Sequence, residues 1–319
     1  MNVHMLTIAI VHFNTSDITK RCISSILSVL DGTALADSYQ ISIVDNKSEI
    51  HEFKNLQEFI QGLSRKNIFL YRNCMNSGFG LGCMLALNNS AGKFIAFINS
   101  DTFFDEDCFT PLINFMHSNP SAGVVTPQHK DGEGRPMRSV SRFDSFGSRF
   151  IGSWVSRLPL QKTIQKSVDA ESAFIVDFVF GSFMLVRRDS FATVGGFDPN
   201  IFLYYEEMDL CLRLKLAGFE SYFMPSVSFY HLGNGSSAVS EKLRFESLLS
   251  MLYVIRKHRG FLYFIFFYIA LVIQYLIKAP FKSRNRRILI KLFGAIVPQA
   301  LSIRISQSCN FDVVNFHEV

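Results

Sequence analysis

The sequence predicts an α/β protein with a mainly parallel sheet flanked by helices, followed by a helical C-terminal appendage. Short apolar runs alternate with helical patterns from residue 6 to residue 98, which is typical of β-α-β units with right-handed crossovers. The run Phe94–Ile98 is apolar at every position, as in a strand buried on both faces. Beyond residue 240, a long apolar stretch stands among basic residues. We therefore expect two parts, residues 1–240 and residues 241–319.

The first half of the chain contains the alternation itself. Leu6–Phe13 has strand composition, and Ser16 or Asp17 could cap the helix that follows. The glycine-rich turn Asn73–Gly82 is expected to open a later helix. The further elements expected here are strands at Gln40–Val44, Asn67–Arg72 and Phe94–Ile98, and helices at Glu52–Leu63 and Cys83–Ser90.

The next stretch is less regular. Asp105, Glu106 and Asp107 precede a helical pattern, and we interpret them as capping acids in preference to a metal site. Residues 130–168 are irregular and basic, which leaves a functional loop and a surface excursion equally open. The elements expected around them are strands at Gly123–Pro127, Val176–Arg187 (broken by Gly181) and Ser221–Val227, and helices at Cys108–His117, Met208–Ala217 and Ala238–His258.

The C-terminal part favours contact with a membrane. Phe261–Ile277 is apolar and spans roughly 25 Å as a helix, just short of the ~30 Å hydrocarbon core. Residues 256–304 hold ten Lys or Arg and no acid, so removing them from the net charge of +5 leaves the rest at −5. This combination suits an in-plane anchor on anionic lipid better than nucleic-acid binding. A buried core helix and a spanning helix are the alternatives.

The overall composition is consistent with this division. The chain has 319 residues, 33 of them Phe, and a mean hydropathy of +0.19, so some apolar surface must face a membrane, a partner or a large core. Its six cysteines show no metal-ligand spacing and are expected to be reduced thiols of a cytosolic protein. No secretory signal is recognised at the N-terminus.

Polar clusters follow four of the expected strands of the first half. They are Phe13-Asn14, Asp45-Asn46, Asn76–Gly82 and Asn99–Asp101. Because the carboxyl ends of parallel strands meet at one edge of a sheet, these clusters are expected to line one site. The glycines Gly78, Gly80 and Gly82 would permit close approach of a nucleotide. Their spacing and their place after the third strand disfavour a dinucleotide-dependent dehydrogenase.

The order of these motifs resembles that of a known enzyme family. The matching segments are Phe13-Asn14, Val44-Asp45-Asn46-Lys47-Ser48, Asn76-Ser77-Gly78-Phe79-Gly80-Leu81-Gly82, Ile98-Asn99-Ser100-Asp101-Thr102, Gly195 to Arg213, and His231 to Ser236. Two details depart from the family pattern: Ile201 replaces a Phe, and Asn234 replaces a Gly. The chain resembles glycosyltransferase family 2 with the nucleotide-diphospho-sugar transferase (GT-A) fold, in its rhamnosyltransferase-like branch of bacterial surface-polysaccharide enzymes. The resemblance covers residues 5–240.

The resemblance implies roles for the donor-binding residues. Asp45 would contact the nucleotide base, and the donor site would include Phe13, Asn14, Asp45, Asn46, Asn76, Gly78, Gly80, Asn99 and Asp101. Asp101 would bind Mg²⁺ or Mn²⁺, which bridges the donor diphosphate. Asn99 stands in the place of the first acid of the family's D-x-D motif and adds no charge. His231 is either a further metal ligand or a structural hydrogen bonder.

The resemblance also implies the catalytic base. It maps to Glu207, the second acid of the pair Glu206-Glu207, which would accept the proton of the acceptor hydroxyl. Glu206 and Asp209 are expected to support it, partly as the acidic first turn of a helix. Arg213 is placed to pair with Asp209 at the i, i+4 spacing.

The implied activity is that of an inverting, metal-dependent hexosyltransferase. It would move one sugar, rhamnose by this resemblance, from a nucleotide-diphospho-sugar to a lipid-linked saccharide acceptor in O-antigen or related lipopolysaccharide synthesis. Its place would be the cytoplasmic face of the bacterial inner membrane, as a peripheral or monotopic protein. The alternatives are transfer of galactose, glucose or N-acetylglucosamine, and a catalytically silent membrane scaffold that only binds nucleotide. The synthase motif Gln-x-x-Arg-Trp is absent from the sequence, which favours single-sugar addition.

Overall fold

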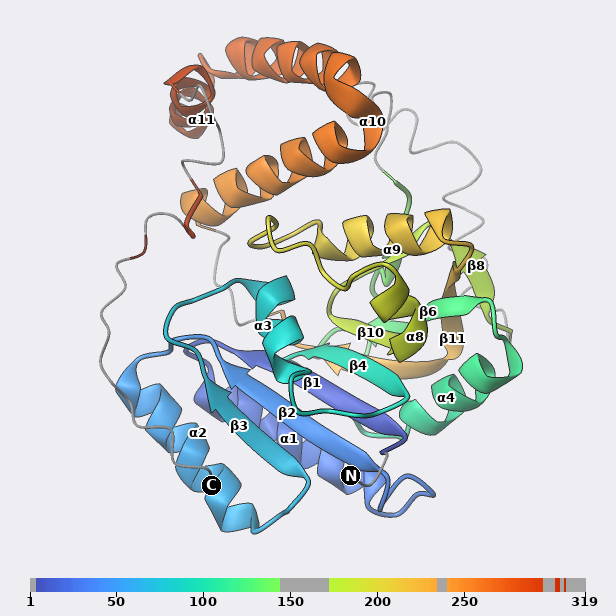
Figure 1. The fold of residues 1–319 in the computed structure, drawn as a ribbon. Helices are drawn as coiled ribbons and strands as arrows, with labels where there is room; N and C mark the ends of the chain where they lie inside the picture. The colour runs from blue at the N-terminus through green and yellow to red at the C-terminus, as the bar shows by residue number, and fades with distance from the viewer. Residues whose placement is uncertain (1–3, 144–171, 234–239, 295–301, 305–306, 308–319) are drawn as a thin grey trace.

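The molecule is organised around a mixed, largely parallel sheet (Figure 1). The computed structural model describes residues 4–143, 172–233, 240–294, 302–304 and 307. The described residues form a nine-stranded sheet in the order β3-β2-β1-β4-β10-β6-β11-β5, with β8 added beside β11. A separate two-stranded sheet pairs β7 with β9. The strands of the first half and the pair β6–β11 run parallel, while β10 runs antiparallel to both of its neighbours.

The first half has the predicted alternation. Its elements are β1 (Leu6–His12), α1 (Ser16–Leu30), β2 (Tyr39–Asp45), α2 (Ile50–Leu63), β3 (Ile68–Arg72), α3 (Phe79–Ala86) and β4 (Phe94–Asn99). The prediction that α3 begins at Cys83 was wrong, because the helix already includes Gly80 and Gly82. These glycines let α3 pack closely: a methyl group on Gly82 would lie 2.9 Å from Val11 Cγ2, and one on Gly80 would lie 3.1 Å from Phe197 Cβ.

The second half differs more from the prediction. Its elements are β5 (Thr102–Phe103), α4 (Phe109–Ser118), β6 (Ala122–Lys130), β7 (Val140–Ser141), β8 (Phe174–Val176), β9 (Phe178–Val179), β10 (Phe183–Arg187), α8 (Arg188–Thr193), α9 (Glu206–Leu216) and β11 (Glu220–His231). The single strand expected at Val176–Arg187 is three strands that pair with β11, with β7, and with β4 and β6. Most of the loop predicted at 130–168, and the later part of the His231–Ser236 motif, lie outside the described residues.

Two predictions about helix caps have different outcomes. Asp107 caps α4, since its Oδ1 accepts hydrogen bonds from the backbone nitrogens of Phe109 and Thr110 at 2.8 and 3.0 Å. The prediction that Ser16 or Asp17 caps α1 was wrong. Helix α1 begins at Ser16, whose backbone nitrogen donates to the Glu52 carboxylate of α2 at 2.8 Å. The orphan donors of a helix N-terminus are thus satisfied by a neighbouring helix.

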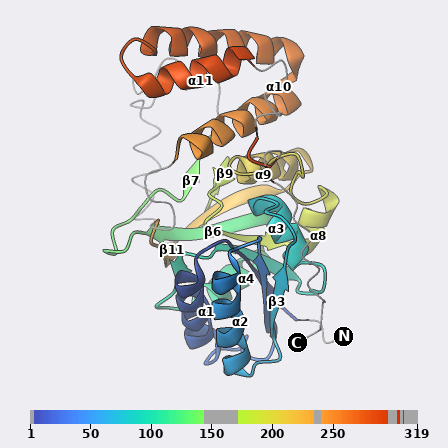
Figure 2. The same ribbon diagram turned by 90° about the vertical axis from the view of Figure 1, so that its left-hand side faces the viewer.

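The sheet separates two hydrophobic layers (Figures 1 and 2). One core lies under α1, α2 and α4, and contains Ile8, Ile23 and Leu112. The other lies under α3, α8 and α9, and contains Phe97 and Phe197. These two rings pack edge to face with centroids 4.9 Å apart on one face of β4, while Ile98 of β4 packs into the first core on the other face. The carboxyl end of β4 is the place where the predicted site begins.

The C-terminal helices form a separate layer beyond α9 (Figure 1). Helix α10 (Glu241–Lys278) is kinked at Gly260, whose φ of 80° and ψ of 172° are not helical, and α11 (Ser283–Gly294) packs against its second half. The first half of α10 contributes Val254 to the core that lies under α9. Among the described residues, α10 is the one helix long and apolar enough to cross a membrane.

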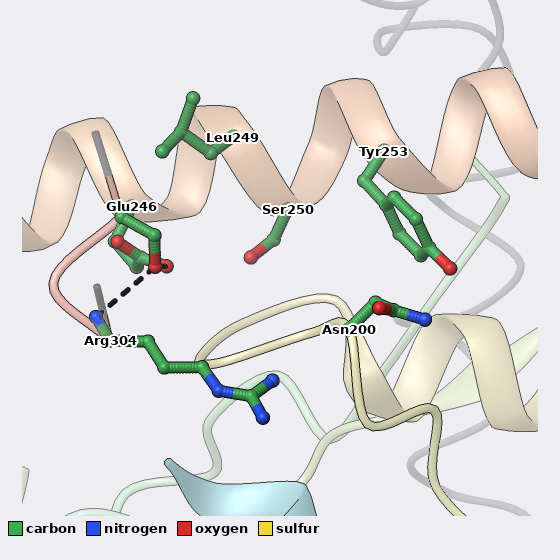
Figure 3. A pocket seen from close by; sticks show the side chains of 7 residues that line it. Asn200, Glu246, Leu249, Ser250, Tyr253 and Arg304 are labelled. Atoms are coloured by element: carbon green, nitrogen blue, oxygen red, sulfur yellow. Dashed lines mark hydrogen bonds between the residues drawn. The ribbon is translucent and has the colours of Figure 1, made fainter. Parts of the chain in front are cut away.

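The segment 302–304 returns to the first half of α10. Ser302 and the backbone nitrogen of Ile303 donate to the buried Glu246 carboxylate at 2.7 and 2.9 Å. Arg304 donates to the carbonyl of Pro199 at 2.5 Å. Ser302, Arg304 and Glu246 are among the residues that line a cavity of about 230 Å³ between α10 and the loop that contains Asn200 (Figure 3). This cavity contains no residue of the predicted site.

Candidate active site

Asp101, His231 and Asn99 converge at the carboxyl end of β4. Strand β5 pairs antiparallel with β11, which places His231 opposite Thr102 and therefore beside Asp101. His231 Nε2 lies 2.9 Å from Asp101 Oδ1 and 3.4 Å from the Asn99 amide nitrogen. The side chains of Asp101 and His231 are 14% and 18% exposed, so they are accessible from solvent and yet held in place. The structure thus brings together three predicted residues that are up to 132 positions apart in the sequence.

This group presents a carboxylate oxygen and an imidazole nitrogen at one point. Among the described residues, no group of three or more His, Cys, Asp or Glu side chains could hold a metal ion without further ligands. A divalent cation at Asp101 and His231 would therefore take its remaining ligands from phosphate oxygens and water, as Mg²⁺ commonly does in nucleotide sites. The donor set fits such an ion.

Asp45, predicted to contact the nucleotide base, is fully buried. Its Oδ1 accepts a hydrogen bond from the Ser48 backbone nitrogen at 3.2 Å and lies 3.7 Å from His12 Nε2, while Oδ2 lies 3.6 Å from Arg72 Nε. Burial lowers the pKa of His12, although the nearby Asp45 charge opposes that change. His12 Nε2 and Asp45 Oδ2 are buried without a hydrogen-bond partner. The role of Asp45 at the base stays a prediction, and His12 and Arg72 are neighbours that the sequence did not suggest.

Asn46 organises the glycine-rich loop. Its amide nitrogen donates to Asn76 Oδ1 and to the Gly78 carbonyl, both at 2.9 Å, and its oxygen accepts from Ser77 and Asn73. From the C-terminal segment, the Gln307 side chain hydrogen-bonds the backbone nitrogen and oxygen of Asn76 at 3.0 and 2.8 Å. The polar groups of Asn46 are therefore used within the protein, and donor binding by Asn46, Asn76 and Gly78 stays a prediction.

Phe13 and Asn14 lie at the end of β1. Phe13 is 46% exposed, an unusual setting for a large apolar side chain, and is available to a flat ligand. Asn14 adopts a left-handed φ of 54°, and its Oδ1 accepts a hydrogen bond from the Glu49 backbone nitrogen at 2.8 Å. Asn14 thus fixes the start of α2, while its neighbour Phe13 remains accessible.

The acidic pair stands at the start of α9. Tyr204 and Tyr205 precede it with φ values of 68° and 69°, which are costly for aromatic residues and typical of functional sites. Burial raises the pKa of Glu207 to about 7, and burial together with the Glu207 charge raises the pKa of Glu206 well above its usual range. The Glu206 Oε2 atom is buried without a hydrogen-bond partner. Near neutral pH, Glu207 is therefore the member of the pair that ionises first and can accept a proton.

The turn Gly181–Ser182 lies between Glu207 and the strand end that contains Asn99, near Asp101. A methyl group on Gly181 would lie 4.0 Å from the carboxyl carbon of Glu207. The next residue, Ser182, accepts a hydrogen bond from the Asn99 backbone nitrogen at 3.1 Å. The end of β4 and the carboxyl of Glu207 thus flank the same two-residue turn before β10. The break that the sequence places at Gly181 coincides with this approach.

Asp209 is the centre of a buried charge cluster. It is fully buried, and Arg213 binds its Oδ2 at 2.7 and 2.8 Å, which agrees with the expected i, i+4 pair. Lys257 and His258 of α10 both lie 2.7 Å from Oδ1. Burial alone would raise the pKa of Asp209, but these partners lower it to about 2. At neutral pH Asp209 is ionised and links α9 to α10. No sequence pattern pointed to Lys257 and His258 as its partners.

Residues 7–195, more than half of the chain, match the family described as glycosyl transferase family 2. The chain belongs to glycosyl transferase family 2. It is therefore a glycosyltransferase that uses a nucleotide-sugar donor, and the predicted GT-A fold and enzyme class are confirmed.

Two proteins to which this chain is similar have rhamnosyltransferase names. The chain is 28% identical to rhamnosyltransferase WbbL of Escherichia coli (strain K12) over 258 residues, which are 79% of this chain and 94% of the relative. It is 30% identical to an N-acetylglucosaminyl-diphospho-decaprenol L-rhamnosyltransferase of Mycobacterium tuberculosis (strain CDC 1551 / Oshkosh) over 137 residues, 42% of this chain and 45% of that protein.

A solved structure supports the fold of this family 2 member. It is the crystal structure of GalNAc-T7 with UDP, GalNAc and Mn²⁺, with a TM-score of 0.60 and 16% sequence identity. The similarity covers 80% of this chain and 48% of the other chain. At 16% identity, this structural similarity supports the fold and no further property of the chain.

Proposed function

We propose that this glycosyltransferase transfers a single rhamnose, with inversion, from a nucleotide-diphospho-sugar to a lipid-linked saccharide. The observation that carries the proposal is the position of Glu207, a base with a pKa of about 7, across the Gly181–Ser182 turn from Asp101 and His231. Inverting transfer needs a carboxylate on one side of the sugar and a site for the departing diphosphate on the other. This arrangement offers both.

The chemistry proceeds in one displacement. Glu207 takes the proton of the acceptor hydroxyl while that oxygen forms a bond to the anomeric carbon. The bond between the anomeric carbon and the diphosphate oxygen breaks, and the nucleoside diphosphate leaves with the electron pair. Glu206, whose pKa is raised well above its usual range, stays protonated and adds no second negative charge beside the base.

We also propose that a divalent cation, Mg²⁺ or Mn²⁺, is held by Asp101 and His231. When bound, it would neutralise charge on the departing diphosphate. The name of the GalNAc-T7 structure includes Mn²⁺ and UDP, which supports divalent metal use in the fold. Asn99 would orient His231 from 3.4 Å and contributes no charge.

The names of the relatives support the sugar and the acceptor. Both are called rhamnosyltransferases, and one name specifies a diphospho-decaprenol acceptor, which is a lipid carrier. A role in O-antigen or related surface-polysaccharide synthesis, at the cytoplasmic face of the bacterial inner membrane, would follow from such an acceptor. The exposed apolar residues of α10 and α11 suit a peripheral or monotopic attachment.

A transfer assay with a panel of nucleotide sugars tests the proposal. We expect a nucleotide-diphospho-rhamnose to be the preferred donor and activity to require Mg²⁺ or Mn²⁺. Glu207→Gln should lower kcat by roughly 10²- to 10⁴-fold while the donor still stabilises the fold. Asp101→Ala should lose metal-dependent donor binding. Glu58→Gln, at an exposed position of α2, is the matched control.

Three outcomes would change the conclusion. Full activity of both site variants would refute the mechanism. Preference for galactose, glucose or N-acetylglucosamine donors would keep the mechanism and replace the sugar. Tight nucleotide binding by the wild type without transfer to any acceptor would favour the silent scaffold.

A further inference from the structure

A basic groove lies where α10 ends and α11 begins. It has a volume of about 560 Å³, and its lining residues are Gln274, Tyr275, Lys278, Phe281, Lys282, Arg284 and Asn285. Among these described residues there are three cationic side chains and no acid. The nearby acid Glu241 binds Arg287, which does not line the groove, at 2.6 and 2.7 Å. The hydrogen bond from Arg287 and, to a smaller extent, the charge of the groove residue Arg284 lower the pKa of Glu241. The three cations therefore give the groove a net positive charge.

An apolar surface borders the groove. Two side chains of this surface, Ile277 and Phe281, are 66% and 82% exposed. Further exposed apolar side chains on the same two helices are Phe266, Ile269, Ile273, Leu276, Ile290 and Phe293. Contiguous exposed apolar surface of this kind marks an interaction site. The groove and this surface together match an amphiphile with an anionic head and an apolar tail.

The two helices form a hairpin that suits a surface position. Phe267 and Leu271 of α10 pack against Ile288 and Leu292 of α11, and Tyr268 donates to the Leu292 carbonyl at 2.7 Å. Helix α11 has 12 residues and a length of roughly 18 Å, too short to cross a ~30 Å hydrocarbon core. After the hairpin, residues 302–304 contact Glu246 in the first half of α10 and the carbonyl of Pro199. The chain therefore returns to the part of the protein from which the hairpin starts. A hairpin of this length lies along a bilayer more readily than through it.

We propose that the groove lined by Lys278, Lys282 and Arg284 binds the phosphate of an anionic membrane phospholipid. The inference rests on the membrane attachment in the proposed function and assigns it a headgroup site. The neighbouring apolar side chains enter the acyl region while the cations remain at headgroup depth, as long basic side chains do at an interface. Nucleic acid would not require the apolar border, and a free phosphate ester would not use it.

Flotation of the purified full chain with vesicles tests this site. The wild type should bind vesicles of phosphatidylcholine with phosphatidylglycerol in preference to phosphatidylcholine alone. Lys278→Gln/Lys282→Gln should weaken that partition by about 30-fold, since each basic residue near an anionic surface contributes a factor of roughly five. Thermal unfolding of each variant checks that the fold is retained.

Two matched double variants distinguish a site from general attraction. Lys54→Gln/Lys66→Gln removes the same charge at exposed positions remote in sequence from the hairpin and should leave partition unchanged. Arg256→Gln/Arg259→Gln removes two positive charges beside the apolar helix but outside the groove, and it should weaken the partition onto vesicles less than fivefold. An equal loss in this pair and in the groove pair would overturn the proposal in favour of diffuse attraction.

Soluble competitors separate the possible occupants. Glycerol phosphate at matched ionic strength should not release the wild type from vesicles, because it lacks the acyl chains. Release would assign the groove to free phosphate esters and overturn the proposal. Transfer activity of the groove variant in detergent should equal that of the wild type. Loss of all transfer in the wild type would reject the proposed function while leaving the vesicle result intact.

Discussion

At the residue scale, the Glu207 carboxylate is expected to lower the free energy of unfolding near neutral pH, because the burial that makes it more basic also disfavours its charged form. Its pKa is about 7 in the folded chain against 4.5 in an exposed glutamate, so the folded state holds the proton more tightly. Stability is therefore greatest below pH 4.5 and falls as the pH rises to about 7. Glu207→Gln should be more stable than the wild type at pH 8 by about 3 kcal/mol, and equally stable near pH 4. Urea unfolding at both pH values measures this, and an equal difference at both would contradict it.

Asp209 is expected to behave in the opposite way. Its partners lower its pKa from 3.8 to about 2, so its contribution is present above pH 4 and is lost as the pH falls through about 2. Asp209→Asn leaves Lys257, His258 and Arg213 facing a neutral amide and should cost about 3 kcal/mol at pH 7. The deficit should shrink on acidification toward pH 2. Chemical unfolding across this range is the measurement, and a constant deficit would show that the charge is irrelevant.

At the scale of elements, the sequence predicted a strand or helix best where the hydrophobic pattern of the segment matches the layers that it packs against. Of the four parallel strands of the first half, β1, β2 and β4 are buried almost throughout and β3 lies half-buried at the edge of the sheet. All four were located within a residue or two. Val176–Arg187 was misjudged because an apolar run without alternation does not reveal where a chain changes partner. Helix α3 was misjudged because glycine lowers helix propensity, whereas here its small size permits close packing with Val11 and Phe197.

The start of α3 also supplies a prediction about how two elements are joined. Gly78 has a φ of 82°, and a methyl group there would lie 1.9 Å from the Phe202 carbonyl oxygen. The Phe79 nitrogen donates to that same oxygen at 3.1 Å, so the loop before Glu206 is fixed to α3. Gly78→Ala should lower the free energy of unfolding by about 2 kcal/mol or more and impair transfer. Gly32→Ala, at a glycine with open space around it, should do neither.

At the scale of the whole molecule, parts of the site were accessible from sequence only through the family resemblance. Asp101 and His231 are brought together by pairing of β5 with β11, which no local pattern encodes. The clamp of Lys257 and His258 on Asp209 joins positions about 48 residues apart, and a helical charge pattern does not say which buried acid it will meet. Such contacts are decided by the packing of layers, which periodicity does not describe.

This clamp makes two shortened chains informative. A chain ending after Gly260 keeps Lys257 and His258 but lacks the hairpin, so it should fail to bind vesicles and still hold Asp209. A chain ending after Ile255 loses the clamp as well and should be less stable by about 3 kcal/mol, because Asp209 then retains only Arg213 among its three side-chain partners. Both chains lack residues 302–304, so their difference in urea unfolding isolates the contribution of residues 256–260.

The full-length variant Lys257→Met/His258→Leu is the control, and it should reproduce the loss of stability with vesicle binding retained. Equal stability of the two shortened chains would mean that α10 does not stabilise α9 through Asp209, and vesicle binding by either would place the membrane contact elsewhere.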